Sequence, residues 1–282
     1  MTLTGKILIT GASTGIGHAC AIQFARLGYD VLAGVRQPAD REAFQAHSLP
    51  NITPVLLDVT RPESIEGAKA AAGGEGLAGL VNNAGIAVVG PLELVPIEEW
   101  RRQFEVNVIG LVAVTQAFLP LLRRGHGRIV NIGSIAGRSA LPGSAAYDAS
   151  KFAIEAITDA LRMELVPWGI SVSLIEPGAV ATPVWQKTLA ALDDLGRRAA
   201  PDKYALYAGL MASVRKEAEK PRSLVTAGEV VKAVQHAMTA PRPRTRYLVG
   251  RDARLWLLLN LLPDRWRDRV ILGELNKQDR PS

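Results

Sequence analysis

Cysteine, histidine and aromatic residues are scarce in this chain of 282 residues. A single cysteine, Cys20, excludes an intrachain disulfide and is typical of a protein from a reducing compartment. The four histidines, His18, His47, His126 and His236, are scattered without the spacing of metal ligands, so we predict no metal site. Phe, Trp and Tyr together make up only 5% of the sequence.

Long hydrophobic runs are lacking as well. The longest apolar run, around Leu255–Leu262, is interrupted by Asn260 and is too short to span a bilayer. No signal peptide precedes the apolar stretch KILIT at Lys6, so we expect a cytoplasmic protein. Hydrophobic residues make up 48% of the chain, which is long enough to bury a sizeable core. We therefore predict one large α/β domain over residues 1–282.

Positive charge is concentrated near the C-terminus. The net charge is +6, and the stretch from Arg242 to Arg280 holds ten Lys or Arg residues against five Asp or Glu. A solvated arginine-rich surface, a subunit contact and a face against anionic lipid are all compatible with this pattern. Nucleic-acid binding is not predicted, because neither a binding motif nor alternating basic and aromatic residues accompany the charge.

A glycine-rich turn follows the first predicted strand. The stretch TGASTGIG, Thr10–Gly17, places Gly11, Gly15 and Gly17 between that strand and the helix IGHACAIQFARLG. A pyrophosphate needs close backbone approach at such a turn, and a helix N-terminus offers free N–H groups and a favourable dipole. This position at a strand–helix junction of an alternating β/α chain predicts a dinucleotide site.

The ends of the next strands carry residues suited to a nucleotide. Arg36 follows the second strand, nineteen residues after Gly17, where an acid would bind the ribose of NAD and an arginine accommodates the 2′-phosphate of NADP. The alternative is an ordinary surface arginine. Asp58 ends the third strand, ITPVLLDVT, and small residues follow the fourth in NNAG, 82–85. We therefore predict NADP(H) rather than NAD(H).

The stretch from Ser134 to Lys151, SIAGRSALPGSAAYDASK, carries groups suited to proton transfer. If Tyr147 opens a helix, Tyr147 and Lys151 share one face of it. A cation beside the phenol would lower the pKa of Tyr147, which suits general acid–base work on an alcohol or carbonyl. Ser134 ends the apolar strand GRIVNIGS, where its hydroxyl could bind the reacting oxygen. By itself, a YxxxK pair is as compatible with a solvated helix surface.

The second half of the chain supplies a covering segment. The predicted strand GISVSLIEPG ends with Pro177 and Gly178, at the same edge of the sheet as the ends of the preceding strands. Residues 184–222 are predicted to be helical and to form a lid over the site. Turn signals interrupt that segment at Gly196, Pro201 and Pro221. A last strand, RTRYLVG, precedes a C-terminal extension at 250–282, which could cap the pocket, lie between subunits or rest on a membrane.

Taken together, these motifs resemble the short-chain dehydrogenase/reductase family over about residues 5–250. The resemblance rests on TGASTGIG, on NNAG, on Pro177–Gly178, and on Asn107, Ser134, Tyr147 and Lys151 in order and spacing. LAGVR, PVLLDVT, GRIVNIGS and LLPDRWRDR further resemble bacterial relatives of the retinol and hydroxysteroid dehydrogenases. The resemblance implies a Rossmann-type, doubly wound parallel sheet of about seven strands with helices on both faces. We also expect a homo-oligomer, a dimer or a tetramer.

The resemblance implies an oxidoreductase acting on a hydrophobic alcohol or ketone, such as a retinoid or a steroid. Tyr147 would exchange a proton with the substrate oxygen, Lys151 would stabilise the phenolate, Ser134 would orient the substrate, and Asn107 would hold a water of a proton relay. A non-catalytic NADP(H)-sensing or scaffolding protein on the same fold is the alternative, although such relatives usually lose the tyrosine or the lysine.

The resemblance also assigns contacts. The NADP(H) site would comprise Gly11, Ser13, Ile16, Gly17, Arg36, Asp58, Val59, Asn83, Ala84, Gly85, Tyr147, Lys151, Pro177, Gly178, Val180 and Thr182. The substrate would meet Ser134, Ile135, Leu141, Tyr147 and Trp185, unless the apolar members of this set simply pack the lid. Two positions depart from the family pattern: Glu176 stands where many members carry Asn, and Thr14 where some NADP-preferring members carry a basic residue.

Overall fold

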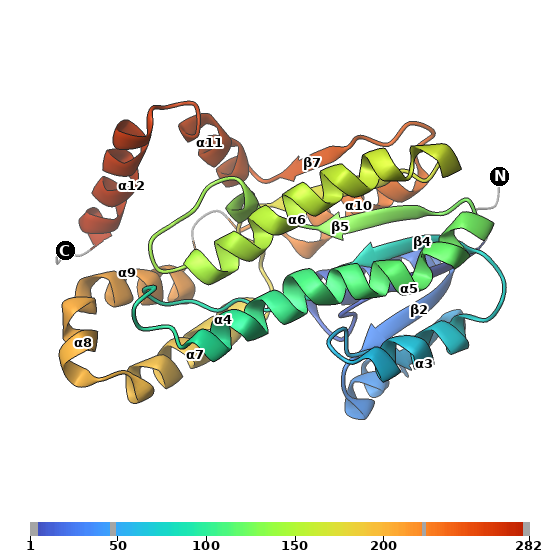
Figure 1. Cartoon of the computed structure of the whole chain (residues 1–282), viewed down its shortest axis with the longest axis horizontal. Coiled ribbons are helices and arrows are strands. Elements are labelled where there is room, and N and C mark those ends of the chain that lie inside the picture. The colour runs from blue at the N-terminus through green and yellow to red at the C-terminus, as the bar shows by residue number, and fades with distance from the viewer. Residues whose placement is uncertain (1–4, 46–48, 222–223, 279–282) are drawn as a thin grey trace.

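The computed structural model describes residues 5–45, 49–221 and 224–278, and these form a seven-stranded parallel sheet flanked by helices (Figure 1). His47 and the last four residues of the C-terminal extension lie outside the described residues. The strands are β1 (Lys6–Ile9), β2 (Asp30–Val35), β3 (Ile52–Leu56), β4 (Leu77–Asn82), β5 (Arg128–Ile132), β6 (Val172–Pro177) and β7 (Arg246–Val249).

The strand order is β3-β2-β1-β4-β5-β6-β7, and every pairing is parallel. Along the chain, β2 and β3 therefore lie on one side of β1, and β4 pairs with the other side of β1. The loops after β1 and β4 diverge at this crossover, which is where open α/β sheets bind ligands. The predicted fold class is confirmed.

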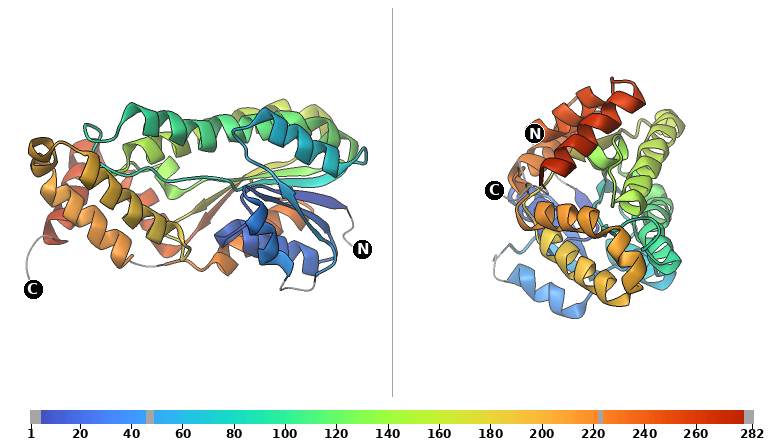
Figure 2. Two further views of the ribbon diagram at one scale, coloured as in Figure 1. Left: turned by 90° about the horizontal axis from the view of Figure 1, so that it is seen from below. Right: turned by 90° about the vertical axis from the view of Figure 1, so that its left-hand side faces the viewer.

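Helices cover both faces of the sheet (Figure 2). On one face lie α1 (Gly15–Arg26) and α10 (Ala227–Thr239), with the short η1 (Pro38–Arg41) and α2 (Glu42–Gln45) at the β2–β3 edge. On the other face lie α3 (Pro62–Ala72), α5 (Gly110–Arg124) and α6 (Ala145–Glu164), followed by η4 (Val166–Trp168). Right-handed β–α–β connections require this alternation of faces.

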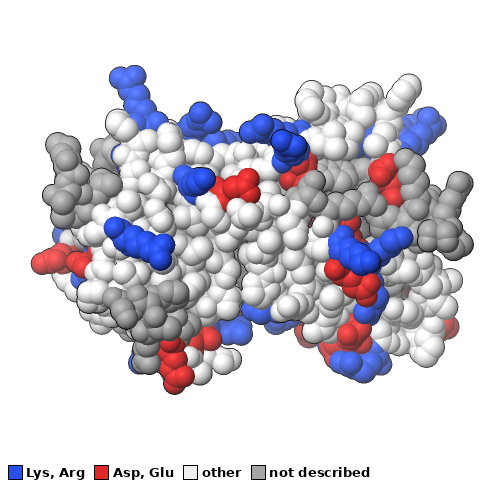
Figure 3. Space-filling view, turned by 180° about the vertical axis from the view of Figure 1, so that it is seen from behind, with Lys and Arg blue, Asp and Glu red and all other residues white. Residues whose placement is uncertain are grey.

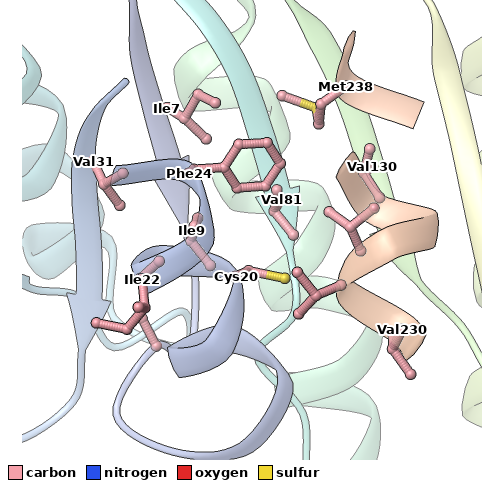
Figure 4. Close-up of a cluster of buried hydrophobic side chains, with 14 of the residues drawn as sticks. Ile7, Ile9, Cys20, Ile22, Phe24, Val31, Val81, Val130, Val230 and Met238 are labelled. Atoms are coloured by element: carbon pink, nitrogen blue, oxygen red, sulfur yellow. The ribbon is translucent and has the colours of Figure 1, made fainter. Parts of the chain in front are cut away.

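The hydrophobic core lies between these helices and the sheet. Figure 4 shows Phe24 and Cys20 of α1 packed against Ile7, Ile9 and other strand side chains, with Val230 and Met238 of α10 beside them. The central strands read as unbroken apolar runs because both of their faces are buried, as in other parallel sheets. Burial of Cys20 raises the pKa of its thiol to about 12, so this lone cysteine is a core residue.

The long helical segment predicted at 96–124 is continuous but not uniform. It consists of α4 (Ile97–Phe104), a π-helical turn, η2 (Glu105–Ile109), and α5. Residues 97–124 form the one helix among the described residues that is long and apolar enough to cross a membrane. Half of its most apolar window is buried inside the protein, and core helices of soluble proteins meet the same criterion. The π turn holds Asn107, and such turns occur often at functional sites.

Beyond the carboxyl end of the sheet lie the segments that the sequence assigns to a lid and a C-terminal extension (Figure 2). Residues 184–219 form α7 (Val184–Arg198), α8 (Pro201–Leu206) and α9 (Ala208–Glu219), and α11 (Arg251–Leu259) and α12 (Asp264–Gln278) follow β7. The turn predicted at Gly196 is wrong, because this glycine lies inside α7. Arg197 and Arg198 both pair with Asp194 and offset the cost of about 1 kcal/mol that glycine imposes on a helix.

Charged side chains are spread over the face opposite to that of Figure 1. Figure 3 shows Lys and Arg interspersed with Asp and Glu among large uncharged areas. Elsewhere on the surface, charged side chains form pairs such as Arg61–Glu63 and Lys69–Glu66. On this face, the net charge of +6 is not gathered into one basic surface.

Candidate active site

The crossover between β1 and β4 is held by buried polar groups. The Thr10 hydroxyl accepts hydrogen bonds from the backbone N–H groups of Asn83 and Ala84, at 3.0 and 2.9 Å. The Asn83 side-chain amide in turn donates to the carbonyl oxygens of Thr10 and Gly11, both at 2.9 Å. Two side chains therefore tie the ends of two adjacent strands together, and Asn83 serves the backbone rather than pointing to solvent.

The glycine-rich turn packs closely on the loop after β4 and leads into an uncapped helix N-terminus. Gly11 has φ of 63°, and a Cβ there would lie 2.8 Å from the Cα of Ala84, so only glycine fits. Thr14 is the N-cap of α1, its side chain makes no capping hydrogen bond, and the first turn of α1 holds no acidic residue. The first N–H groups of α1 are thus available to an anion, which the helix dipole favours.

The residues predicted for the adenosine half lie at the ends of β2 and β3. Arg36 directly follows β2 and is exposed, as its predicted role requires. Asp58 accepts hydrogen bonds from the Thr60 N–H and hydroxyl, at 3.0 and 2.8 Å. The Val59 side chain is buried in the core against Gly110, so only its backbone is placed to meet a nucleotide.

The predicted proton-transfer groups come together beside this crossover. Ser134 caps the short 3-10 helix η3 (Ile135–Gly137), with its hydroxyl accepting from the Ala136 N–H at 3.1 Å. The Ser134 side chain is near enough to Tyr147 to lower the pKa of its phenol. Tyr147 and Lys151 lie in the first two turns of α6, and the Lys151 Nζ is 5.6 Å from the centroid of the Tyr147 ring. Lys151 donates to the Ile132 carbonyl at the end of β5, at 2.9 Å.

Burial dominates the ionisation of this pair. Burial raises the pKa of Tyr147, which outweighs the lowering by the nearby Ser134 side chain, and the neighbouring Asp148 carboxylate raises it further. Burial also lowers the pKa of Lys151 to about 8. The predicted depression of the Tyr147 pKa is therefore wrong for the protein without a nucleotide. The physical reason is that desolvation penalises both charged forms, and the ammonium is directed at a backbone carbonyl.

Asn107 is buried and fully engaged. Its Oδ1 accepts from the Ile86 N–H at 2.9 Å, while its Nδ2 donates to the Ile86 carbonyl at 3.0 Å and to the Ser150 hydroxyl at 3.1 Å. Gln103, one turn earlier, makes a second set of bonds to the same loop and to Ser150. Because both amide hydrogens are used, any further partner of Asn107 would have to donate to its Oδ1.

The segment after β6 is fixed by a residue that the sequence analysis missed. Asp252 of α11 accepts a hydrogen bond from the Ala179 N–H at 2.8 Å, and its carboxylate occupies the space that a Cβ on Gly178 would need. The Trp185 indole donates to the Val180 carbonyl at 2.8 Å, and Thr182 lies against Gly15. The glycine-rich turn and the 177–182 segment therefore face each other. No local signal in the sequence links Asp252 to Gly178.

The remaining predicted substrate contacts lie on the turn after Ser134 and at the start of α7. Ile135 is half-buried in η3, Leu141 is exposed at its edge, and the half-buried Trp185 opens α7. Asp148 accepts hydrogen bonds from the Leu141 N–H at 2.8 Å and the Ser144 hydroxyl at 2.7 Å. Burial raises the pKa of Asp148 to about 6, since it outweighs these two bonds. Asp148 was missed although it directly follows Tyr147.

An open parallel sheet with a glycine-rich turn at its crossover and an uncapped helix N-terminus beside it defines a dinucleotide-binding class of α/β protein. The family model described as "short chain dehydrogenase" matches residues 5–193. Retinol dehydrogenase 5 of Mus musculus is 37% identical over 277 residues, which cover 94% of this chain and 87% of that protein. The chain therefore belongs to the short-chain dehydrogenase family of oxidoreductases.

Solved structures of similar fold carry either nicotinamide nucleotide. A short chain dehydrogenase from Burkholderia cenocepacia J2315 in complex with NADP is 26% identical, with a TM-score of 0.73, and the match covers 99% of this chain and 98% of that one. A short chain dehydrogenase/reductase from Burkholderia phymatum in complex with NAD shares the fold at 24% identity, with a TM-score of 0.73 over 98% and 93% of the two chains. The fold alone does not choose between the two nucleotides.

Proposed function

We propose that this protein is an NADP(H)-dependent oxidoreductase that interconverts a hydrophobic alcohol and the corresponding ketone or aldehyde. The observation that carries the proposal is that Tyr147 and Lys151 lie together beside the crossover, with the Lys151 Nζ 5.6 Å from the centroid of the Tyr147 ring, and that Ser134 lies close enough to affect the pKa of the Tyr147 phenol. A hydroxyl and a phenol close together at the carboxyl edge of a nucleotide-binding sheet suit proton exchange with a substrate oxygen.

The residues present fit a nicotinamide nucleotide. The start of α1 offers free N–H groups, and Thr182 of the segment after β6 lies against Gly15 of the glycine-rich turn. NADP(H), when bound, supplies or accepts the hydride. The other residues assigned to the nucleotide are part of the same proposal. They lie on the loops around the glycine-rich turn or in the first turn of α1, and they include Ser13, Ile16, Gly85, Val180 and Thr182.

Side chains of the protein itself exchange the proton with the substrate oxygen. A raised pKa keeps the Tyr147 phenol protonated at neutral pH, so it is ready to donate to a carbonyl oxygen during reduction. Ser134 orients that oxygen and offsets the charge that develops on it. In the oxidation direction the phenol must first lose its proton, which a charged Lys151 would favour. Asn107 fixes the Ile86 turn and α6, and a water would reach it only by donating to Oδ1.

The preference for NADP(H) rests on Arg36. Its exposed guanidinium follows β2, where the 2′-phosphate of NADP would lie, and a guanidinium binds phosphate strongly. We expect Arg36→Ala to weaken NADPH binding at least about tenfold while changing NADH binding less than about twofold. Titration of both nucleotides into both proteins measures this, and equal wild-type affinities for NADPH and NADH would contradict the preference.

The substrate class follows from the apolar surroundings of the site. Ile135, Leu141 and Trp185 line the substrate side, and the similarity to a retinol dehydrogenase supports a retinoid- or steroid-like alcohol or ketone. A panel of retinoids, steroids and aliphatic ketones with NADPH, followed by nicotinamide absorbance, tests the activity. If the protein binds NADPH tightly, turns over no member of the panel and associates with another protein only when NADPH is bound, the non-catalytic sensing alternative is correct.

We also propose how the chain is organised. Residues 1–282 form one domain, α7 to α9 act as a lid, and the C-terminal extension makes a homo-oligomeric contact of a cytoplasmic protein. The support is a set of exposed apolar side chains on α11, on the turn after it and on α12, including Leu258 and Leu261, which are 61% and 81% exposed. A weak peripheral membrane contact is the competing role. Sedimentation with and without anionic vesicles separates the two, because only the membrane role predicts vesicle-dependent pelleting.

A further inference from the structure

The first turn of the C-terminal extension is bound to the segment that follows β6. Asp252 is the second residue of α11, and its Oδ2 accepts a hydrogen bond from the Ala179 N–H at 2.8 Å. A Cβ on Gly178 or on Gly250 would overlap its carboxylate, so two glycines make room for this side chain. Its Oδ1 is buried, and no donor of the described residues reaches it. The carboxylate therefore binds the backbone of another segment and does not cap its own helix.

The segment that Asp252 contacts runs from the end of β6 to the glycine-rich turn. The Gly178 N–H donates to the Val249 carbonyl at 2.9 Å, which continues the pairing of β6 with β7. The Ala179 carbonyl accepts from the Val225 N–H at 2.7 Å, and the Thr182 side chain lies against the glycine-rich turn. The bond from the Ala179 N–H to Asp252 thus completes the set of contacts that fix where this segment meets the turn.

The other end of α11 holds the turn that carries Ser134. Asn260 is the C-cap of α11, and its Nδ2 donates to the Arg138 carbonyl at 2.6 Å. Arg138 ends η3 at the end opposite Ser134, and its N–H donates to the Ile135 carbonyl at 2.9 Å. One helix of the C-terminal extension therefore contacts both the segment assigned to the nucleotide and the turn assigned to the substrate oxygen.

Both contacts lie on one face of α11. Asp252 and Asn260 are eight positions apart, and the fully buried Ala253 lies on the same face. Leu255 and Leu258 lie on the opposite face and are exposed. At about 1.5 Å per residue, the two contacts are about 12 Å apart along the helix axis. A hydrogen-bonded helix holds such a distance more firmly than a loop does, so α11 fixes the spacing between the two segments.

We propose that Asp252 and Asn260 are positioning residues for the reaction proposed above, and that α11 sets the distance between the 178–182 segment and the Ser134 turn. Hydride transfer requires nucleotide and substrate to be close together and aligned, so this distance matters to the reaction. What the two segments bind rests on the proposed function, but their attachment to α11 does not.

Substitutions at the two ends of α11 test the two contacts separately. Asp252→Ala removes the acceptor of the Ala179 N–H, whereas Asp252→Asn keeps an oxygen that can accept. Asn260→Ala removes the donor to the Arg138 carbonyl. The matched control is Asp264→Ala, because Asp264 lies in the first turn of α12 but is 83% exposed and pairs only with neighbours in its own helix.

Amide hydrogen exchange reads the attachment of each segment without any activity. Exchange in residues 178–182 should rise at least about tenfold in Asp252→Ala and change less than about threefold in Asp252→Asn and Asp264→Ala. Exchange in residues 134–139 should rise at least about fivefold in Asn260→Ala. Gly178→Ala displaces the carboxylate without removing it and should raise exchange in 178–182 as Asp252→Ala does, so the contact is tested even if Asp252→Ala does not fold.

Nucleotide affinity and KM read the positioning role. The Kd for NADPH should rise at least about tenfold in Asp252→Ala and stay within about threefold of the wild type in Asp252→Asn, Asn260→Ala and Asp264→Ala. With NADPH saturating and any substrate that the wild type turns over, KM should rise at least about threefold in Asn260→Ala and not in Asp264→Ala.

The two kinds of measurement fail separately. Unchanged exchange in 178–182 in the folded Asp252→Ala and Gly178→Ala proteins would overturn the attachment through Asp252, and unchanged exchange in 134–139 would overturn that through Asn260. Altered exchange with wild-type NADPH affinity in Asp252→Ala would overturn its positioning role. If the wild type binds no nicotinamide nucleotide, the proposed function fails, while the exchange results still decide whether α11 holds the two segments.

Discussion

The two sides of the candidate site are held together by different forces. At the nucleotide edge, the buried side chains of Thr10 and Asn107 and the half-buried side chain of Asn83 hydrogen-bond to the backbone of adjacent loops at 2.9–3.0 Å. On the lid side, exposed Glu93 pairs with Lys203 of α8 at 3.6 Å and accepts from the Tyr207 hydroxyl at 3.0 Å. Behind these surface contacts lies an apolar cluster in which Leu192, Leu195 and Met211 of the lid are buried.

The two kinds of contact differ in how much each contributes to stability. Leaving a buried N–H group without its acceptor costs about 1–3 kcal/mol, whereas a surface ion pair contributes about 0–1 kcal/mol. The nucleotide edge is therefore held by polar contacts to the backbone, whereas the lid is held by apolar packing and surface pairs. This division suits a protein that binds one fixed nucleotide and admits a bulky hydrophobic substrate.

The largest effect is expected at the crossover. Thr10→Val keeps the shape of the side chain but removes the acceptor of two half-buried backbone N–H groups, those of Asn83 and Ala84. We expect the free energy of unfolding to fall by about 2–4 kcal/mol, measured by urea titration. The exposed Thr53→Val is the matched control and should change it by less than about 0.5 kcal/mol. A loss at Thr10 no larger than at Thr53 would show that the crossover is not held as described.

A smaller effect of opposite sign is expected at Lys151. Its pKa is lowered from 10.5 to about 8, so the folded state disfavours the ammonium, and this cost is fully present below about pH 8 and disappears toward pH 10.5. Lys151→Met removes the cost and should raise the melting temperature at pH 7 by at least about 2 °C, with a smaller gain at high pH. Turnover should fall at least about 10²-fold in the same variant. A lower melting temperature at pH 7 would mean that the bond to Ile132 outweighs burial.

The smallest effect is expected at the lid. Glu93→Gln removes the charge that pairs with Lys203 but keeps an acceptor for Tyr207. Stability should change by less than about 0.5 kcal/mol, while KM for the substrate should rise about twofold because the closed lid is held less firmly. Steady-state kinetics beside urea titration separates the two quantities. A stability loss comparable to that of Thr10→Val would erase the contrast between the two sides of the site.

The sequence predicts the structural features that depend on residues close together in the chain. The alternation of apolar strands and helices, the turn at Gly11 and the shared face of Tyr147 and Lys151 all follow from local spacing, and the sheet confirms the fold class. Contacts between distant segments are not predictable in this way. Asp252 reaches Ala179 across 73 positions, and Arg246 of β7 pairs with Glu155 of α6 across 91. The predicted lowering of the Tyr147 pKa is wrong for a related reason. The burial that raises this pKa depends on the whole fold rather than on local sequence.

One measurement tests the central claim most directly: the turnover of Tyr147→Phe, determined on the same sample as its affinity for NADPH. The phenylalanine preserves the ring that packs beside Lys151 and removes only the hydroxyl near Ser134. If Tyr147 moves the proton, turnover falls at least about 10²-fold while NADPH affinity stays within about threefold of the wild type. Turnover near that of the wild type, with nucleotide fully bound, would contradict the assignment of Tyr147 as the general acid and base.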